Sequence, residues 1–348
     1  MSPPDFDTTM QPMKTDVLIV GAGPVGLFAI FACGQLDLNC IVVDTLEQQG
    51  GQCISLYPDK PIYDIPGRRS IAASELIEEL TAQAAPYRPR YLLGDCVVTI
   101  SGDVKNGWSL QTQNGVVVEC RAVIIAGGNG LFEPVRPTLD GLAQYEGRSV
   151  FYAVKKREEF AGKRLVIAGG GDSALDWALA LSSISAKCYL VHRRPRFRAA
   201  PATTKMLDQL VASGMIEILA PGHLSGLEGA DGILSGVRVR IGAGERLVEA
   251  DMLLPFYGLR TELGPLAGWG LDMLDGKIVV EPGTCSTSRP GIFAIGDIAH
   301  YFGKLGLILT GFADAAHAAH AAHAFVRPEV VLNFVHSTTR GDPAAAVA

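Results

Sequence analysis

Residues 17–26, Val-Leu-Ile-Val-Gly-Ala-Gly-Pro-Val-Gly, join a short apolar run to a glycine-rich turn. Small and apolar residues follow to about Leu36, and a second apolar run, Cys40–Val43, ends at an acid. This order predicts a strand, a tight turn, a helix and a second strand, which is the unit that binds dinucleotides. In that unit the glycines let the backbone approach a pyrophosphate, and the acid accepts hydrogen bonds from ribose hydroxyls. The predicted ligands are Gly21, Gly23, Gly26 and Asp44.

The same pattern occurs a second time, with one decisive difference. Leu165–Ala168 is an apolar run that enters a second glycine turn, and a helical stretch and the strand-like run Cys188–Val191 follow. Where the first copy has its acid, this copy has a histidine and a group of arginines. Guanidinium groups bind a 2′-phosphate through charge-assisted hydrogen bonds, whereas a carboxylate repels it. We therefore expect the first turn to bind FAD and the second NADPH, with a solvated basic loop as the alternative. The predicted NADPH ligands are Gly169, Gly171, Asp172, Ser173, His192, Arg193, Arg194 and Arg198.

A third motif lies near the end of the chain. The apolar run Ile292–Ile295 ends at Gly296-Asp297, shortly before an alanine-rich helical stretch near 311–326. In a flavin-binding fold this acid can accept hydrogen bonds from the ribitol hydroxyls, and the positive end of the following helix stabilises negative charge on the flavin. Together with the two turns, the motif indicates an FAD-binding unit built from both ends of the chain.

These motifs predict an α/β protein with two Rossmann-like, three-layer ββα nucleotide-binding domains, the NADPH domain inserted into the FAD domain. A chain of 348 residues, 48% of them apolar, is long enough to bury two such cores. The expected bounds are 14–135 and 255–330 for the FAD domain, 136–254 for the NADPH domain, and 331–348 for a C-terminal extension that covers the flavin.

Composition and charge exclude several other classes. A net charge of −6 argues against a general nucleic-acid binder. The uncharged stretch Val17–Gly34 is long enough to resemble a membrane span, but it contains the glycine turn and no cationic segment precedes it. Seven cysteines without a CxxC pair are typical of reduced thiols. We expect a soluble, cytoplasmic protein that holds no metal.

With these motifs in place, the chain resembles the thioredoxin reductase family of flavoproteins and, more closely, the thioredoxin-reductase-like ferredoxin/flavodoxin–NADP⁺ reductases. The resemblance covers about residues 14–340. The segments that carry it are Gly50-Gly51-Gln52, Leu56-Tyr57-Pro58, Ile62-Tyr63-Asp64, Gly169–Trp177, His192–Ala199, Gly296-Asp297 and His336-Ser337-Thr338. Asp44 stands where the family usually has glutamate, and the residues before Met13 have no counterpart.

The resemblance implies roles for individual residues. Tyr57 is expected on one face of the flavin ring, and His336 on the other, with His336 supplied by the partner subunit of a homodimer. No side-chain acid or base is essential to hydride transfer, so no catalytic residue beyond these two flanking residues is predicted. The implied FAD contacts are Asp44, Gln52, Val97, Phe132, Asp297 and Thr338.

The cysteines decide where the electrons go. Thioredoxin reductases carry a CxxC pair in the NADPH domain, but 136–254 contains only Cys188. Glutathione-reductase-like enzymes carry CxxxxC after a glycine pair. Here Cys53 occupies the position of the first cysteine, but Pro58 occupies the position of the second. Because disulfide exchange needs two thiols, the resemblance leaves ferredoxin or flavodoxin as the electron carrier. An NADPH oxidase or diaphorase acting on quinones or free flavins, and a flavin-based redox sensor, stay open as alternatives.

Two charged features remain without a firm assignment. Arg68-Arg69, Arg88 with Arg90, and 155–157 are candidate docking sites for an acidic carrier, although each is more simply a solvated surface. Histidines recur at every third position of the alanine-rich stretch, at His317, His320 and His323. Residues at this spacing drift around a helix, so that the outer two lie about 120° apart. We therefore expect no metal site there.

Overall fold

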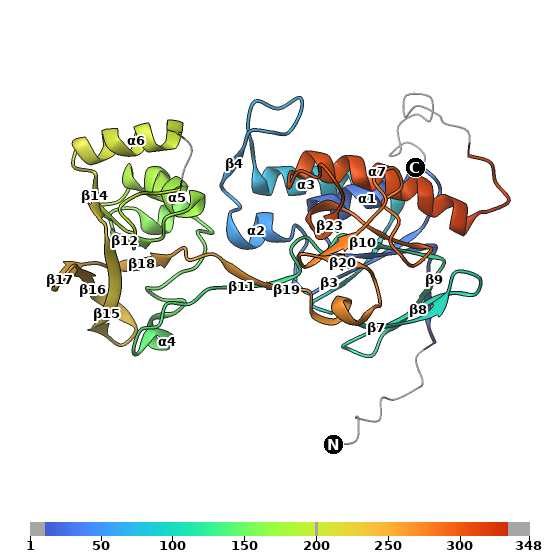
Figure 1. Cartoon of the computed structure of the whole chain (residues 1–348), viewed down its shortest axis with the longest axis horizontal. Helices are drawn as coiled ribbons and strands as arrows, with labels where there is room; N and C mark the ends of the chain where they lie inside the picture. Colours follow the sequence, from blue (N-terminus) through green and yellow to red (C-terminus); the bar gives the residue numbers. More distant parts are fainter. Residues whose placement is uncertain (1–10, 199–200, 333–348) are drawn as a thin grey trace, which may run out of the picture. The chain divides into compact units, whose positions relative to one another are not determined.

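A computed structural model describes residues 11–198 and 201–332. The chain divides into two compact units (Figure 1). Unit 1 comprises the described residues of Met1–Ser55, Lys60–Leu131 and Thr261–Ala348, and unit 2 those of Leu56–Asp59 and Phe132–Arg260. The second unit is thus inserted into the first, as the sequence predicts.

The centre of unit 1 is a parallel five-stranded sheet in the order β22-β10-β2-β3-β6. Strands β2, β10 and β22 are continuous apolar runs because both faces of the sheet are covered. The first residue of β2, Val17, pairs with Cys40 of β3, so the glycine turn and Asp44 both follow the carboxyl ends of the strands. The bounds are β2 Val17–Val20, β3 Cys40–Asp44, β6 Arg90–Leu93, β10 Ala122–Ile125 and β22 Ile292–Ala294.

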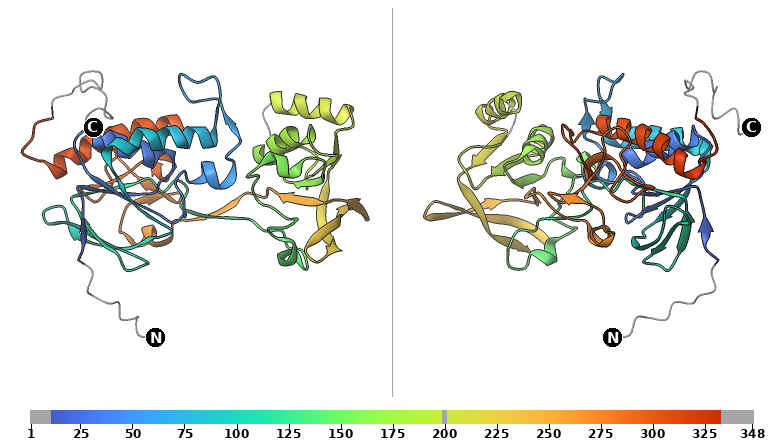
Figure 2. Two further views of the ribbon diagram at one scale, coloured as in Figure 1. Left: turned by 180° about the vertical axis from the view of Figure 1, so that it is seen from behind. Right: turned by 45° about the vertical axis from the view of Figure 1, so that its right-hand side comes forward.

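Helices cover one face of this sheet and an antiparallel sheet covers the other, which gives three layers (Figures 1 and 2). Helix α1 packs against both α3 and α7, and the rings of Phe28 and Phe312 lie 5.0 Å apart between α1 and α7. On the opposite face, Leu18 and Ile125 share a core with Trp108 of the antiparallel sheet β1-β9-β8-β7. The bounds are α1 Pro24–Gly34, α3 Ala73–Ala84, α7 Ile308–Val326, β1 Met13–Lys14, β7 Val97–Asp103, β8 Gly107–Thr112 and β9 Val117–Cys120.

Short elements complete unit 1 and connect its segments. A small hairpin, β4-β5, precedes α3, and a three-stranded sheet, β20-β21-β23, precedes α7. Turn η4 carries the predicted Gly296-Asp297 motif. The bounds are α2 Gln52–Leu56, β4 Pro61–Ile62, β5 Ile71–Ala72, η1 Ala85–Tyr87, η3 Gly264–Gly268, β20 Met273–Leu274, β21 Lys277–Val279, η4 Gly296–Ile298 and β23 Ala299–His300.

Unit 2 has the same three layers in a smaller form. Its parallel sheet has the order β14-β13-β12-β18, with α5 and α6 on one face and the antiparallel sheet β15-β16-β17 on the other (Figure 1). The bounds are α4 Leu142–Tyr145, η2 Arg157–Phe160, β12 Arg164–Ala168, α5 Asp172–Ser182, β13 Lys187–Val191, α6 Pro201–Ala212, β14 Ile216–Leu219, β15 Gly222–Ala230, β16 Ile233–Ile241, β17 Gly244–Glu249 and β18 Met252–Pro255.

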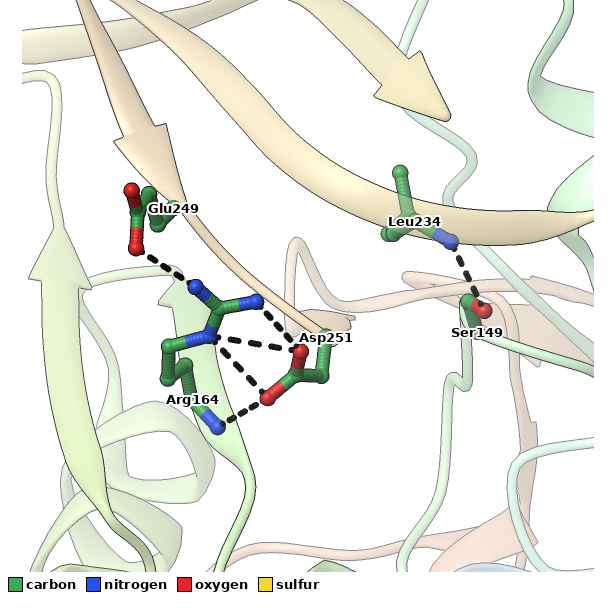
Figure 3. A network of polar contacts seen from close by, with 5 residues as sticks. All are labelled: Ser149, Arg164, Leu234, Glu249 and Asp251. Carbon is green, nitrogen blue, oxygen red and sulfur yellow. Dashed lines mark hydrogen bonds and ion pairs between the residues drawn. The ribbon is translucent and has the colours of Figure 1, made fainter. Parts of the chain in front are cut away.

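A polar network fastens the amino ends of the parallel strands in unit 2 (Figure 3). Arg164 begins β12, and its guanidinium binds Asp251 at 2.6 Å and Glu249 at 2.6 Å. The backbone N–H of Arg164 also donates to the Asp251 carboxylate, at 2.8 Å. Nearby, the buried hydroxyl of Ser149 accepts from the N–H of Leu234 at 3.2 Å. The network lies at the strand ends opposite the glycine turn, so its contribution is to stability.

The chain passes between the units in the strands β11 Leu131–Pro134 and β19 Leu259–Glu262, which pair with each other, and also on both sides of Leu56–Asp59. At the two strands the unit boundaries fall at 131/132 and 260/261. The expected bounds of the two nucleotide-binding domains, at 135/136 and 254/255, stay predictions. The structure adds one segment that the sequence does not indicate, because Leu56–Asp59 belongs to unit 2.

Candidate nucleotide-binding sites

The first glycine turn is packed so tightly that two of its glycines accept no side chain. Gly21 has a φ of +110°, and a Cβ there would collide with the carbonyl oxygen of Ala126. A Cβ on Gly26 would collide with the carbonyl oxygen of Gly21. At Gly23, by contrast, a Cβ would meet no atom of the chain within 4 Å. The turn therefore presents an open backbone surface at the start of α1, which fits a pyrophosphate.

Asp44 supports this turn from the end of β3. Its carboxylate accepts hydrogen bonds from the N–H of Ala22, at 2.6 Å, and of Leu46, at 2.8 Å. Burial raises the pKa of Asp44, and the two backbone hydrogen bonds act against this rise. Because each carboxylate oxygen has two acceptor positions, Asp44 retains capacity for a ribose hydroxyl.

Two further predicted FAD contacts lie close to the same turn. The N–H of Gly50 donates to the carbonyl of Ala22 at 2.8 Å, which brings the start of α2, at Gln52, beside the turn. The N–H of Asp95 donates to the carbonyl of Asp44 at 3.0 Å, which places Val97 just beyond Asp44. The structure thus gathers residues from three distant sequence segments.

The Gly296-Asp297 motif converges on the same helix terminus. Gly296 has a φ of +73°, and a Cβ there would contact the side chain of Val25, in the first turn of α1, at 3.4 Å. The side chain of Val25 also leaves no room for a Cβ on Gly311 of α7. Asp297 is partly exposed beside this packed turn. The arrangement fits an extended cofactor that runs from Asp44 past Gly23 to Asp297.

Behind this motif lies a polar cluster that sequence reasoning missed. Asp314 is buried in α7 and binds Gly296, Tyr301 and Lys304. The sequence does contain a signal, because Asp314 is the one acid of the apolar helix Ile308–Val326. A carboxylate on such a helix needs partners if it is buried.

The second glycine turn, in unit 2, repeats the first in outline. A Cβ on Gly169 would lie 2.6 Å from the carbonyl oxygen of Phe256, whereas a Cβ on Gly171 would meet nothing within 4 Å. Gly171 precedes α5, which begins with Asp172 and Ser173. The open backbone at the positive end of an eleven-residue helix again fits a phosphate group.

The predicted phosphate-binding loop folds back onto this turn. The ring of His192 fills the space where a side chain on Gly170 would stand, and it stacks on Phe197 with centroids 5.1 Å apart. Burial, together with the charges of Arg193, Arg194 and Arg198, lowers the pKa of His192. These three arginines are exposed. The loop therefore presents exposed cationic side chains beside the stacked ring of His192.

Four other predicted flavin contacts lie away from this turn or outside the described residues. Tyr57 belongs to unit 2 and packs, half-buried, against the core that contains Phe160. Phe132 lies in the crossing strand β11 and is partly buried. His336 and Thr338 lie outside the described residues. The roles of these residues at the flavin stay predictions.

The thiols are arranged for packing. All seven cysteines lie in the described part of the chain, and none forms a disulfide. Cys33 and Cys40 interact with each other, and their hydrogen bond, followed by burial, raises the pKa of the Cys40 thiol. This pair lies at the amino end of β3, opposite the edge that carries Asp44. Cys188, in unit 2, is fully buried.

The three histidines of helix α7 differ in their exposure to solvent. His317 and His320 are exposed, while His323 is buried. Within residues 11–198 and 201–332, no three His, Cys, Asp or Glu side chains are grouped so that they can hold a metal ion. In the same residues, no helix has the length and apolar character needed to cross a membrane.

Comparisons with known proteins agree with this geometry. Residues 15–324 match the family described as pyridine nucleotide-disulphide oxidoreductase. A protein of Paramagnetospirillum magneticum named ferredoxin–NADP reductase is 54% identical over 335 residues, which cover 96% of this chain and 99% of the relative. A protein of Rhodospirillum rubrum with the same name is 53% identical and covers 95% of this chain and 97% of its own length.

Solved structures show the same fold at lower sequence identity. The thioredoxin reductase of T. acidophilum is 24% identical with a TM-score of 0.74, over 89% of this chain and 98% of that one. The thioredoxin reductase of Lactococcus lactis is 22% identical with a TM-score of 0.73, and the match covers 90% of this chain and 99% of that one. The two-unit α/β architecture is therefore that of the thioredoxin reductases.

Proposed function

Because the chain belongs to the pyridine nucleotide-disulphide oxidoreductase family, we propose that it is a ferredoxin–NADP⁺ reductase that uses FAD. It moves electrons between NADPH and a one-electron carrier, ferredoxin or flavodoxin. Relatives at 54% and 53% identity over nearly the whole chain carry the name ferredoxin–NADP reductase, which supports this choice. The observation that carries the proposal is the pair of dinucleotide turns with opposite charge, Asp44 beside one and the arginine loop beside the other.

In this proposal unit 1 binds FAD. Asp44 holds the adenosine ribose, the open backbone at Gly23 receives the pyrophosphate, and Asp297 accepts from the ribitol hydroxyls. Gln52 and Val97 complete the site as predicted. When bound, FAD supplies the chemistry that this chain lacks, since it accepts a hydride and releases the electrons singly.

Unit 2 binds NADPH in the same proposal. The open backbone at Gly171 faces the pyrophosphate, where the positive end of α5 offsets its charge. Arg193, Arg194 and Arg198 bind the 2′-phosphate. An NADH molecule, which lacks this phosphate, leaves the three guanidinium groups without their ligand.

The cysteines support a carrier outside the chain as the electron acceptor. Disulfide exchange needs two thiols at the flavin or on the nucleotide unit. Unit 2 contains one cysteine, the buried Cys188, and the contacting pair Cys33 and Cys40 lies at the sheet edge away from the turns. Neither arrangement suits exchange with a partner disulfide.

The proposal also covers the compartment, the oligomeric state and the C-terminal extension. We propose a cytoplasmic homodimer in which the extension 331–348 covers the flavin. His336 of this extension lies on the face of the ring opposite Tyr57. Removing the extension is then expected to change the absorption spectrum of the bound flavin, and an unchanged spectrum would contradict this part.

Rapid mixing tests the main proposal. The purified protein is expected to be yellow, to be reduced faster by NADPH than by NADH, and to be reoxidised by purified ferredoxin or flavodoxin. Reoxidation by oxygen or quinones alone, with neither carrier reacting, would indicate an oxidase or diaphorase. A colourless protein that does not take up FAD would contradict the proposal altogether.

A further inference from the structure

A buried ion pair lies behind the Gly296-Asp297 turn. Asp314, in the middle of α7, has a side chain only 3% exposed, and the side chain of its partner Lys304 is 6% exposed. The Lys304 Nζ lies 2.5 Å from Asp314 Oδ2, which also accepts the N–H of Gly296 at 3.0 Å. Asp314 Oδ1 accepts the hydroxyl of Tyr301 at 2.8 Å. One carboxylate thus binds the turn and the loop that follows it.

Lys304 extends these contacts to the beginning of α7. Its Nζ donates to the hydroxyl of Thr310 at 3.3 Å. That hydroxyl lies within hydrogen-bonding distance of the carbonyl oxygens of Leu305, at 2.7 Å, and Leu307, at 2.9 Å. The path of the chain from Tyr301 to the first turn of α7 is therefore fixed from inside by this pair.

Stability alone does not account for such a pair. The attraction between two buried charges is largely offset by the cost of removing them from water, and apolar side chains of similar volume serve as well or better. The pair does supply a defined geometry, because its hydrogen bonds are directional. The proposed function places one of the two joined segments, the Gly296-Asp297 turn, at the ribitol. The other segment, the beginning of α7, is the helix end expected from the sequence to face the negative charge of the flavin.

We propose that Asp314 and Lys304 are positioning residues for FAD, which hold the Gly296-Asp297 turn and the first turn of α7 against the flavin end of the cofactor. This inference rests on the proposed FAD site in unit 1. The adenosine end of that site, at Asp44, makes no use of the pair. Damage to the pair is therefore expected to weaken binding of FAD and to spare binding of ADP, which is the adenosine half alone.

The test measures both ligands on the full-length protein after its flavin has been removed. Asp314→Asn keeps an acceptor for Gly296 but leaves the charge of Lys304 buried and unpaired, so the double variant Lys304→Met/Asp314→Asn is made as well. Asp16→Asn is the matched control, because Asp16 also accepts a backbone N–H, that of Asn39 at 2.8 Å, at the opposite end of the same sheet. Asp44→Ala serves as the control for the adenosine end.

Both Asp314 variants are expected to raise the Kd for FAD at least about tenfold and to change the Kd for ADP by less than about twofold. They are also expected to shift the flavin absorption bands, which a general loss of stability would not do. Asp16→Asn changes neither Kd, and Asp44→Ala weakens both ligands. Urea unfolding of the flavin-free proteins is expected to show the double variant at wild-type stability.

Two results would overturn the inference. Equal weakening of FAD and ADP by Asp314→Asn would show that the residue only supports the fold. Wild-type FAD affinity in the double variant would show that the pair positions nothing. A wild-type protein that binds neither ligand would instead reject the proposed FAD site, and this inference with it.

Discussion

The backbone N–H of Arg198 donates a hydrogen bond of 2.9 Å to the carbonyl oxygen of Gly170. This bond closes the loop from His192 back onto the second glycine turn, so the cationic residues lie beside the open backbone of that turn. The stacked rings of His192 and Phe197 fill the inside of the loop. In the proposed NADPH site, selectivity for NADPH over NADH therefore depends on the geometry of this loop as well as on its charge.

The arginines of this loop provide the first prediction. In the proposed site, Arg193 and Arg194 each give the 2′-phosphate a charge-assisted hydrogen bond worth about 1.5–3 kcal/mol. Replacing both by alanine is therefore expected to raise the Kd for NADPH about 100-fold or more. Binding of NADH is expected to change by less than about threefold, since it lacks the phosphate. Titration with both nucleotides measures the two values. Arg238→Ala/Arg240→Ala, which removes two exposed charges from β16 of the same unit, is the control. Equal losses for both nucleotides would contradict the assignment.

Gly170 provides the second prediction. A Cβ there would collide with the ring of His192, so Gly170→Ala is expected to destabilise unit 2 by about 1–3 kcal/mol and to weaken NADPH binding. Truncating the ring removes the obstacle, so Gly170→Ala/His192→Ala is expected to be more stable than the sum of its single variants. Thermal unfolding of the four proteins in this cycle measures the coupling. Additive effects would show that ring and glycine do not depend on each other.

Much of the fold follows from the sequence because it rests on repeated local patterns. The apolar strands that end at Gly21 and Gly169 occur where predicted, and so do the helices that follow them. The insertion of one unit in the other follows from the order of the three motifs. Strands β8 and β9 also lie at alternating runs of the sequence, with Asn114-Gly115 between them. Local patterns of this kind do not indicate that their sheet packs on the parallel sheet.

The parts of the site that sequence reasoning missed depend on contacts between distant segments. In the sequence, nothing links Asp314 to the Gly296-Asp297 motif; in the fold, its buried carboxylate accepts the N–H of Gly296. Gly170 looks like a spacer within a glycine run, and its role becomes clear only when the ring of His192 is seen against it. Tyr57 is conspicuous in sequence, yet its short segment packs with unit 2. Such relations follow from tertiary packing, which no local pattern encodes.

The two kinds of glycine in the first turn provide the third prediction. Gly23→Ala adds a methyl group that meets no atom of the chain, so the flavin-free protein is expected to unfold within about 0.5 kcal/mol of the wild type. The same methyl group stands on the surface proposed for the pyrophosphate, so FAD binding is expected to weaken at least about tenfold. Gly26→Ala is the contrast, because its Cβ would collide with Gly21 and lower stability even without ligand. Unchanged FAD affinity in Gly23→Ala would place the pyrophosphate elsewhere.

Asp251 provides a prediction about pH. Its hydrogen bonds with the Arg164 side chain, foremost, and with the Arg164 backbone N–H lower the pKa of Asp251 below its ordinary value of 3.8. A carboxylate with a lowered pKa in the folded state stabilises the protein above its unfolded pKa, and this stability is lost as the pH falls through the folded pKa. Asp251→Asn is therefore expected to lower the stability of unit 2 by about 1–3 kcal/mol at pH 7. This difference in the free energy of unfolding from wild type is expected to close below about pH 3.8.

Urea unfolding between pH 7 and pH 3 measures this difference. Glu249→Gln is the control, because the Glu249 side chain is 78% exposed and its ion pair contributes little. A difference that stays constant with pH would mean that Asp251 acts through its shape and not its charge.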